Sequence, residues 1–156
     1  MNFDFSKEPG KKLEKIDFEN MSGLEPLISI IMPFYNDKEH IEQTINSLLN
    51  QTFPAFEILI IDDGSNDKES IEKLKEIQKL DSRIKVHHKE NGGAAVARDY
   101  GVSKTAKNSK YIVFCDSDDL LNKTYLETAF WTLETNQTAS WAYTDSIGFE
   151  GTEYTW

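Results

Sequence analysis

One stretch of the chain, Phe56-Glu57-Ile58-Leu59-Ile60-Ile61, is a short, mostly apolar run that ends at the turn-forming residues Asp62-Asp63-Gly64-Ser65. Runs of this length that are rich in β-branched residues and bounded by turns are typical of buried strands. Similar runs occur at residues 27–32 and 110–115. Because amphipathic segments separate these runs, we predict an α/β fold, with a mostly parallel sheet covered by helices on both faces.

Strands and helices are predicted to alternate along the chain. Strands are expected at residues 27–32, 56–61, 83–88, 110–115 and 140–144, and helices at residues 38–50, 68–80, 94–106 and 121–134. We expect Pro33 to stop the first strand, and Asn36 or Asp37 to cap the first helix. Residues 1–25 are predicted to be a charged N-terminal arm, and residues 26–156 to form one domain.

Charge and composition restrict the class of ligand. The 156 residues include 27 acidic and 17 basic side chains, for a net charge of −10. A negative chain repels nucleic acid, yet a bound divalent cation can reverse the local field around a small phosphorylated ligand. The single Cys115 excludes an internal disulfide and a cysteine-based zinc site, and fits a reducing cytoplasm. No apolar run reaches the roughly 20 residues that span a bilayer.

Polar residues follow three of the predicted strands, whose carboxyl ends meet at the edge where open α/β sheets bind ligands. Tyr35 can stack on a base or fill the edge of the core. Asp62 or Asp63 can accept hydrogen bonds from a base or ribose, or only stabilise a turn. The cluster Asp116-Ser117-Asp118-Asp119 can hold a hard divalent ion together with water or phosphate, or only cap the next helix.

A glycine pair and an arginine lie between these clusters. Gly92-Gly93 allows the backbone to approach a ligand closely. Arg98, in the following predicted helix, can meet phosphate or sugar, or form an ordinary surface ion pair. The Rossmann, Walker A and serine nucleophile motifs are missing from the sequence, which removes the commonest α/β alternatives.

Several motifs occur in the order typical of family 2 glycosyltransferases, and the chain resembles that family from about residue 26 to residue 145. These motifs are Ile28-Ser29-Ile30-Ile31-Met32-Pro33-Phe34-Tyr35-Asn36, Glu57-Ile58-Leu59-Ile60-Ile61-Asp62-Asp63-Gly64-Ser65, Asn91-Gly92-Gly93 with Ala97-Arg98-Asp99-Tyr100-Gly101, and Tyr111-Ile112-Val113-Phe114-Cys115-Asp116-Ser117-Asp118-Asp119. The resemblance implies a Rossmann-like GT-A fold that is truncated before its acceptor half.

The resemblance also implies a nucleoside-diphosphate-sugar donor, first of all a UDP-sugar, and Mn²⁺ or Mg²⁺ as the cofactor. The donor-binding residues that it implies are Pro33, Tyr35, Asp62, Asp63, Gly92, Arg98, Asp116 and Ser117, and the metal ligands are Asp116 and Asp118. Among them, Asp63 matches the carboxylate that binds the base. Asp99 departs from the asparagine that the family usually has after Ala-Arg, which weakens the assignment of Arg98.

The implied function is donor binding in an inverting, hexosyltransferase-type enzyme of cell-surface polysaccharide synthesis, with a glycan or lipid-linked acceptor. No catalytic residue is assigned; the general base is expected beyond Trp156, and Asp145 is more typical of a polar strand end. The alternatives are a non-catalytic nucleotide-binding or regulatory module, and a metal-dependent nucleotidyltransferase. The expected location is the cytoplasm, with peripheral association at the inner face of the membrane left open.

Overall fold

The computed structural model describes residues 25–136 and 138–144. The described residues form two compact units, residues 25–126 and residues 127–144 without residue 137. Their elements are β1 (Ile28–Phe34), α1 (Ile41–Leu49), β2 (Phe56–Asp62), α2 (Lys68–Ile77), β3 (Ile84–His88), α3 (Ala94–Val102), β4 (Tyr111–Phe114) and α4 (Tyr125–Thr135), the last of which begins in the first unit and ends in the second.

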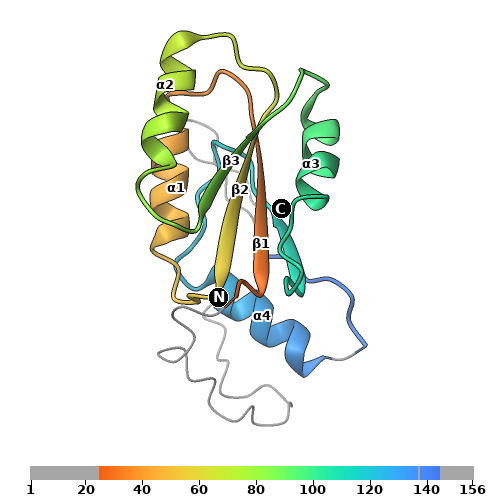
Figure 1. Cartoon of the computed structure of the whole chain (residues 1–156). Coiled ribbons are helices and arrows are strands. Elements are labelled where there is room, and N and C mark those ends of the chain that lie inside the picture. Colours follow the sequence, from red (N-terminus) through yellow and green to blue (C-terminus); the bar gives the residue numbers. More distant parts are fainter. Residues whose placement is uncertain (1–24, 137, 145–156) are drawn as a thin grey trace. The chain divides into compact units, whose positions relative to one another are not determined.

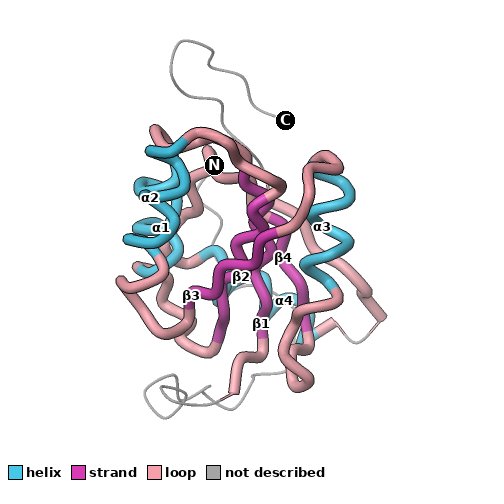
Figure 2. The backbone as a smooth tube through the Cα atoms, turned by 45° about the horizontal axis from the view of Figure 1, so that its top comes forward, coloured by secondary structure: helices cyan, strands magenta, loops and turns pink. Residues whose placement is uncertain are grey.

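The first unit is built on a parallel sheet with the strand order β3-β2-β1-β4. Helices α1 and α2 lie on one face of the sheet and α3 on the other, an arrangement that is visible in two orientations (Figures 1 and 2). β1 and β2 pair over seven residues, from Ile28 opposite Phe56 to Phe34 opposite Asp62, and all of β2 is buried. The predicted α/β class is therefore confirmed, as is the common edge at which the strands end.

β1 continues through Pro33, so the prediction that this proline ends the strand is wrong. The Cys115 backbone N–H donates to the Ile31 carbonyl at 3.1 Å, so residues 31 and 33 direct their backbone groups toward β4. β4 has already ended at Phe114, opposite Ile31. The missing N–H of Pro33 therefore removes no bond from the ladder.

α1 begins later than predicted, and neither expected residue caps it. Its N-cap is His40, whose side chain makes no capping hydrogen bond. The Asp37 carboxylate instead accepts a hydrogen bond from Ser117 Oγ at 2.6 Å and lies 2.7 Å from His40 Nδ1. Asn36 bonds to the loop after β2. Both side chains join loops at the sheet edge, so neither is available to the helix.

α3 packs unusually close to the sheet. Ala97 forms a buried cluster with Ile31, Leu59 and Ile61 of β1 and β2. One turn later, a Cβ on Gly101 would lie 2.4 Å from Ile31 Cγ2, so only glycine allows this approach. The contact fixes the distance between α3 and the strand ends, and with it the position of Arg98.

The second unit contradicts the predicted fifth strand. α4 ends at Thr135, and residues 140–144 belong to no strand. The rings of Trp141 and Tyr143 stack on each other, with their centroids 5.4 Å apart. A strand also needs a neighbour that supplies hydrogen bonds, and the described residues supply none here.

The other predicted elements agree with the structure apart from a few residues at their ends. The predicted arm, residues 1–25, lies outside the described residues except for Glu25, and so does Asp145. Within the part of the chain that is described, each helix is too short or too polar to cross a membrane.

The Gly101→Ala variant tests the close packing of α3. At a position where the helix has free space around it, replacing glycine by alanine would raise the free energy of unfolding by up to about 1 kcal/mol. Here we expect a loss of about 1–3 kcal/mol in the free energy of unfolding, because the added methyl group overlaps Ile31. Urea denaturation measures the change, and Asp99→Ala, at an exposed position of the same helix, is the control that should stay within about 0.5 kcal/mol. A Gly101→Ala protein as stable as the original would contradict the packing argument.

Candidate functional site

The loops that follow β1 and β2 are joined through Asn36. Its backbone N–H donates to Ser65 Oγ, and its side-chain oxygen accepts from the backbone N–H groups of Asn66 and Asp67, all at 3.0 Å. Asn36 has φ = 52°, a left-handed conformation that asparagine tolerates better than most residues. The two loops therefore form one unit at the carboxyl edge of the sheet.

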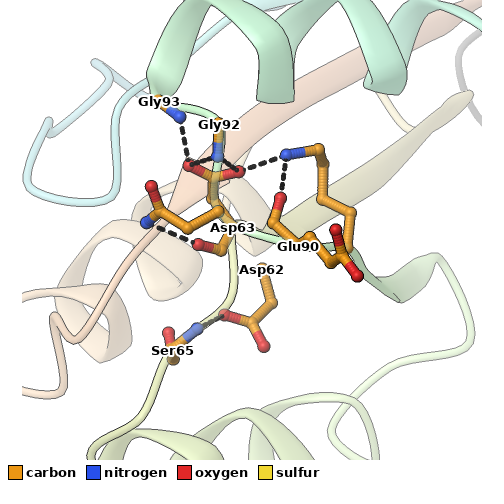
Figure 3. A network of polar contacts seen from close by, with 8 residues as sticks. Asp62, Asp63, Ser65, Glu90, Gly92 and Gly93 are labelled. Atoms are coloured by element: carbon orange, nitrogen blue, oxygen red, sulfur yellow. Dashed lines mark hydrogen bonds and ion pairs between the residues drawn. The ribbon is translucent and has the colours of Figure 1, made fainter.

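Asp63 binds the loop that leads from β3 into α3. Its carboxylate accepts hydrogen bonds from Gly92 N–H at 3.0 and 3.1 Å and from Gly93 N–H at 2.6 Å, and it forms an ion pair with the Lys89 ammonium group (Figure 3). The Asp63 side chain is only 4% exposed and that of Lys89 14%. Asn91 Nδ2 donates to the Asp63 carbonyl at 2.9 Å. Asp63 thus fixes the glycine pair that the sequence singled out.

These contacts set the charge state of Asp63. Burial alone would raise the pKa of its carboxyl group, but the hydrogen bonds from Lys89, Gly92 and Gly93 outweigh burial and hold the pKa below its usual value. A carboxylate offers about four acceptor positions. The three protein donors make four contacts with the Asp63 carboxylate, which keep it ionised.

Asp62 stabilises the turn after β2, which is one of the two roles that the sequence allowed for it. Its Oδ1 accepts from the Ser65 backbone N–H at 3.0 Å, and its Oδ2 lies 2.8 Å from His88 Nδ1. Nothing in the sequence indicated His88 or Lys89 as partners. Both follow from the parallel register, because β3 ends beside β2 at the same edge.

At the carboxyl end of β1, Pro33 is half-buried, and Tyr35, the first residue after the strand, is exposed. The Tyr35 side chain is 49% exposed, so it does not fill the core. The position leaves an aromatic ring accessible next to the Asp62 and Asp63 turn.

The segment after β4 is anchored by helix α1. The Ser117 carbonyl accepts from Thr44 Oγ1 at 2.7 Å, and Ser117 Oγ donates to Asp37. Further along, Gln51 Nε2 donates to the Asn122 carbonyl at 2.8 Å. The buried Ser117, predicted to bind the donor, therefore also attaches the acidic segment to α1, which the sequence did not reveal.

Arg98 forms an ion pair with Asp116, the surface alternative that the sequence left open. Asp118 is exposed. Burial raises the pKa of the Asp119 carboxyl group, and the nearby negative charges of Asp116 and Asp118 raise it further. Burial also raises the pKa of the Cys115 thiol to about 12, so this thiol is not a nucleophile near neutral pH.

Asp116 and Asp118 have the chemistry of ligands for Mn²⁺ or Mg²⁺, which prefer oxygen. Among the described residues, no group of three or more His, Cys, Asp or Glu side chains is arranged to hold a metal ion. An ion held by these two carboxylates would have to take most of its ligands from phosphate oxygens and water.

A parallel α/β sheet with an aromatic residue and two acidic turns at its carboxyl edge is the arrangement expected of a family 2 glycosyltransferase domain. The chain belongs to glycosyl transferase family 2, whose family model matches residues 29–156.

Related proteins carry glycosyltransferase names. The chain is 41% identical over 108 residues to the putative teichuronic acid biosynthesis glycosyltransferase TuaG of Bacillus subtilis, covering 69% of this chain and 42% of TuaG. It is 47% identical over 109 residues to an uncharacterized glycosyltransferase of Rickettsia conorii, covering 70% of this chain and 17% of that protein. The chain thus spans less than half the length of these relatives.

Solved structures confirm the expected GT-A fold. The structure of S. aureus TarS 1–349 in complex with UDP-GlcNAc matches 73% of this chain and 32% of that chain, with a TM-score of 0.63 and 29% identity. The complex of the same protein with UDP matches 73% of this chain and 33% of that chain, with a TM-score of 0.59 and 29% identity.

The Asp63→Asn variant tests the contact that holds the glycine pair. We expect a loss of about 3 kcal/mol in the free energy of unfolding at pH 7, because Lys89 would keep a buried charge without its partner. Urea denaturation measures the loss. Glu90→Gln removes a charge from the neighbouring exposed residue and should have little effect.

The same pair of proteins gives a pH test. Because the pKa of Asp63 is lowered in the folded state, its stabilising effect is present above the unfolded value of about 3.9 and is lost as the pH falls through the folded value. The stability difference between the original and Asp63→Asn proteins should therefore be largest near pH 7 and shrink below about pH 4. A difference that stays constant down to pH 3 would contradict this account.

Proposed function

We propose that this chain is the donor-binding part of an inverting, metal-dependent glycosyltransferase that uses a UDP-sugar. The observation that carries the proposal is the meeting of Tyr35, Asp63 and Asp116 at one sheet edge in a family 2 chain. The complexes of TarS 1–349 with UDP and UDP-GlcNAc support this choice of donor. We propose a hexose or N-acetylhexosamine as the sugar.

We assign the base of the nucleotide to residues at the carboxyl ends of β1 and β2 and in the turns that follow them. In this proposal the exposed Tyr35 ring stacks on the base beside Pro33, and the ionised Asp63 carboxylate accepts a hydrogen bond from an imide N–H of the base. Asp62 and Gly92 support this arrangement by shaping the turn and positioning Asp63. Arg98, Asp116 and Ser117 lie on the ribose and diphosphate side.

We assign Asp116 and Asp118 as the protein ligands of Mn²⁺ or Mg²⁺. When bound, such an ion neutralises the departing diphosphate as a Lewis acid. The chain's own residues bind and orient the donor, so that an acceptor hydroxyl can attack the anomeric carbon from the opposite side and the bond to the diphosphate breaks. We assign the general base to none of the described residues.

The acceptor in this proposal is a glycan or lipid-linked glycoconjugate of the cell surface. TuaG, by its name, belongs to teichuronic acid biosynthesis, which supports a polysaccharide product. A lipid-linked acceptor would bring the protein to the cytoplasmic face of the membrane.

Calorimetry with UDP tests donor and metal binding together. We expect UDP to bind in the presence of Mn²⁺, and at least about tenfold more weakly in EDTA or in the Asp118→Asn variant, which lacks one proposed metal ligand. Glu76→Gln, an equal loss of charge on the exposed face of α2, is the control. Absence of metal-dependent binding of any nucleoside diphosphate would refute the proposal.

The stacking role of Tyr35 has its own test. Tyr35→Ala should weaken UDP binding by about 1–3 kcal/mol, since a base stacked on an aromatic ring contributes that much. Tyr35→Phe keeps the ring and should bind UDP almost as the original protein does. Equal affinities for all three proteins would remove Tyr35 from the site.

A further inference from the structure

The ion pair between Arg98 and Asp116 joins two parts of the chain that the fold holds firmly. Arg98 lies in α3, which packs so closely on β1 that a Cβ added to Gly101 would lie 2.4 Å from Ile31 Cγ2. Asp116 follows Cys115, whose backbone N–H donates to Ile31. The pair therefore results from the packing of both segments on β1, although its side chains remain 33% and 49% exposed.

The charge around this pair is strongly asymmetric. Asp116, Asp118 and Asp119 are close in sequence, and within residues 25–136 and 138–144 Arg98 is the cation that forms an ion pair with this acidic segment. An arginine keeps its charge at any pH a protein tolerates, and its planar guanidinium group binds carboxylates and phosphates alike. Arg98 therefore pairs with Asp116 unless a cation that binds this carboxylate more tightly displaces it.

We propose that Arg98 is a built-in competitor of the divalent cation for Asp116, and that it turns to the donor diphosphate when the metal binds. This inference rests on the proposed function. A divalent ion at Asp116 would place two positive charges beside the guanidinium group, which repels it. The same guanidinium group stabilises a diphosphate that arrives with the metal.

Metal and nucleotide binding are therefore coupled through one side chain. The metal alone must displace Arg98 and then remain next to its charge, so it binds weakly. With the diphosphate present, the Arg98 guanidinium group leaves the Asp116 carboxylate and binds the diphosphate. Its positive charge then favours binding of the diphosphate together with the metal. By linkage, each ligand raises the affinity for the other by the same factor.

The test measures Mn²⁺ binding and UDP binding separately. We compare the original chain with Arg98→Ala and Arg98→Lys, detecting free Mn²⁺ by electron paramagnetic resonance without nucleotide, and UDP by calorimetry at saturating Mn²⁺. Arg98→Ala should bind Mn²⁺ alone roughly 5- to 50-fold more tightly and UDP more weakly by a similar factor. Arg98→Lys, which keeps the charge without the planar fork, should lie between the two.

Lys104→Ala is the matched control, because it removes a positive charge near the end of α3 from a side chain that lies over the Tyr100 ring. It should change both affinities less than about twofold, and circular dichroism should report a folded chain for every variant. Unchanged or weaker Mn²⁺ binding by Arg98→Ala would overturn the inference while leaving metal-dependent UDP binding, and thus the proposed function, intact. If the original chain binds no UDP with Mn²⁺, the proposed function fails, and the Mn²⁺ comparison still decides whether Arg98 competes for Asp116.

Discussion

The parallel pairing of β1 with β2 is the constraint on which the site depends. Its register sets Phe34 beside Asp62, and the Asp63 backbone N–H donates to the Phe34 carbonyl at 2.9 Å, one step beyond the last paired residues. The turns that carry Tyr35 and Asp63 therefore begin side by side, at the same level along the two strands. A shift of one residue would move every buried side chain of β2 to the other face, so the core protects the alignment of the two turns.

Individual cations organise an otherwise acidic edge. Lys89 neutralises Asp63 in a nearly buried position, and Arg98 neutralises Asp116 in a half-exposed one. The difference in exposure separates their roles: a buried pair resists disruption, whereas an exposed pair contributes little and exchanges partners readily. The net charge of −10 thus says less about the ligand than the placement of these two side chains.

Apolar runs were enough to predict β1, β2 and β4 and the edge at which they end, because strands in the interior of a parallel sheet leave a short continuous apolar pattern. They could not predict which strands are neighbours, and so gave no indication that Lys89 meets Asp63 or that Thr44 holds Ser117. Local rules failed where a tertiary contact competed with them. Asp37 was expected to cap α1 but bonds to Ser117 across the edge, and residues 140–144 have the composition of a strand without a neighbour.

The alkylation rate of Cys115 can report on local opening of the acidic segment that follows it. The thiol is 2% exposed, its pKa of about 12 keeps it protonated, and it lies between the end of β4 and Asp116. An alkylating reagent can reach it only when the carboxyl end of β4 opens locally. Because it is the single cysteine of the chain, the rate of alkylation follows one opening equilibrium. Covalent labelling of this one thiol can therefore follow the local stability of this segment over time, without any added probe.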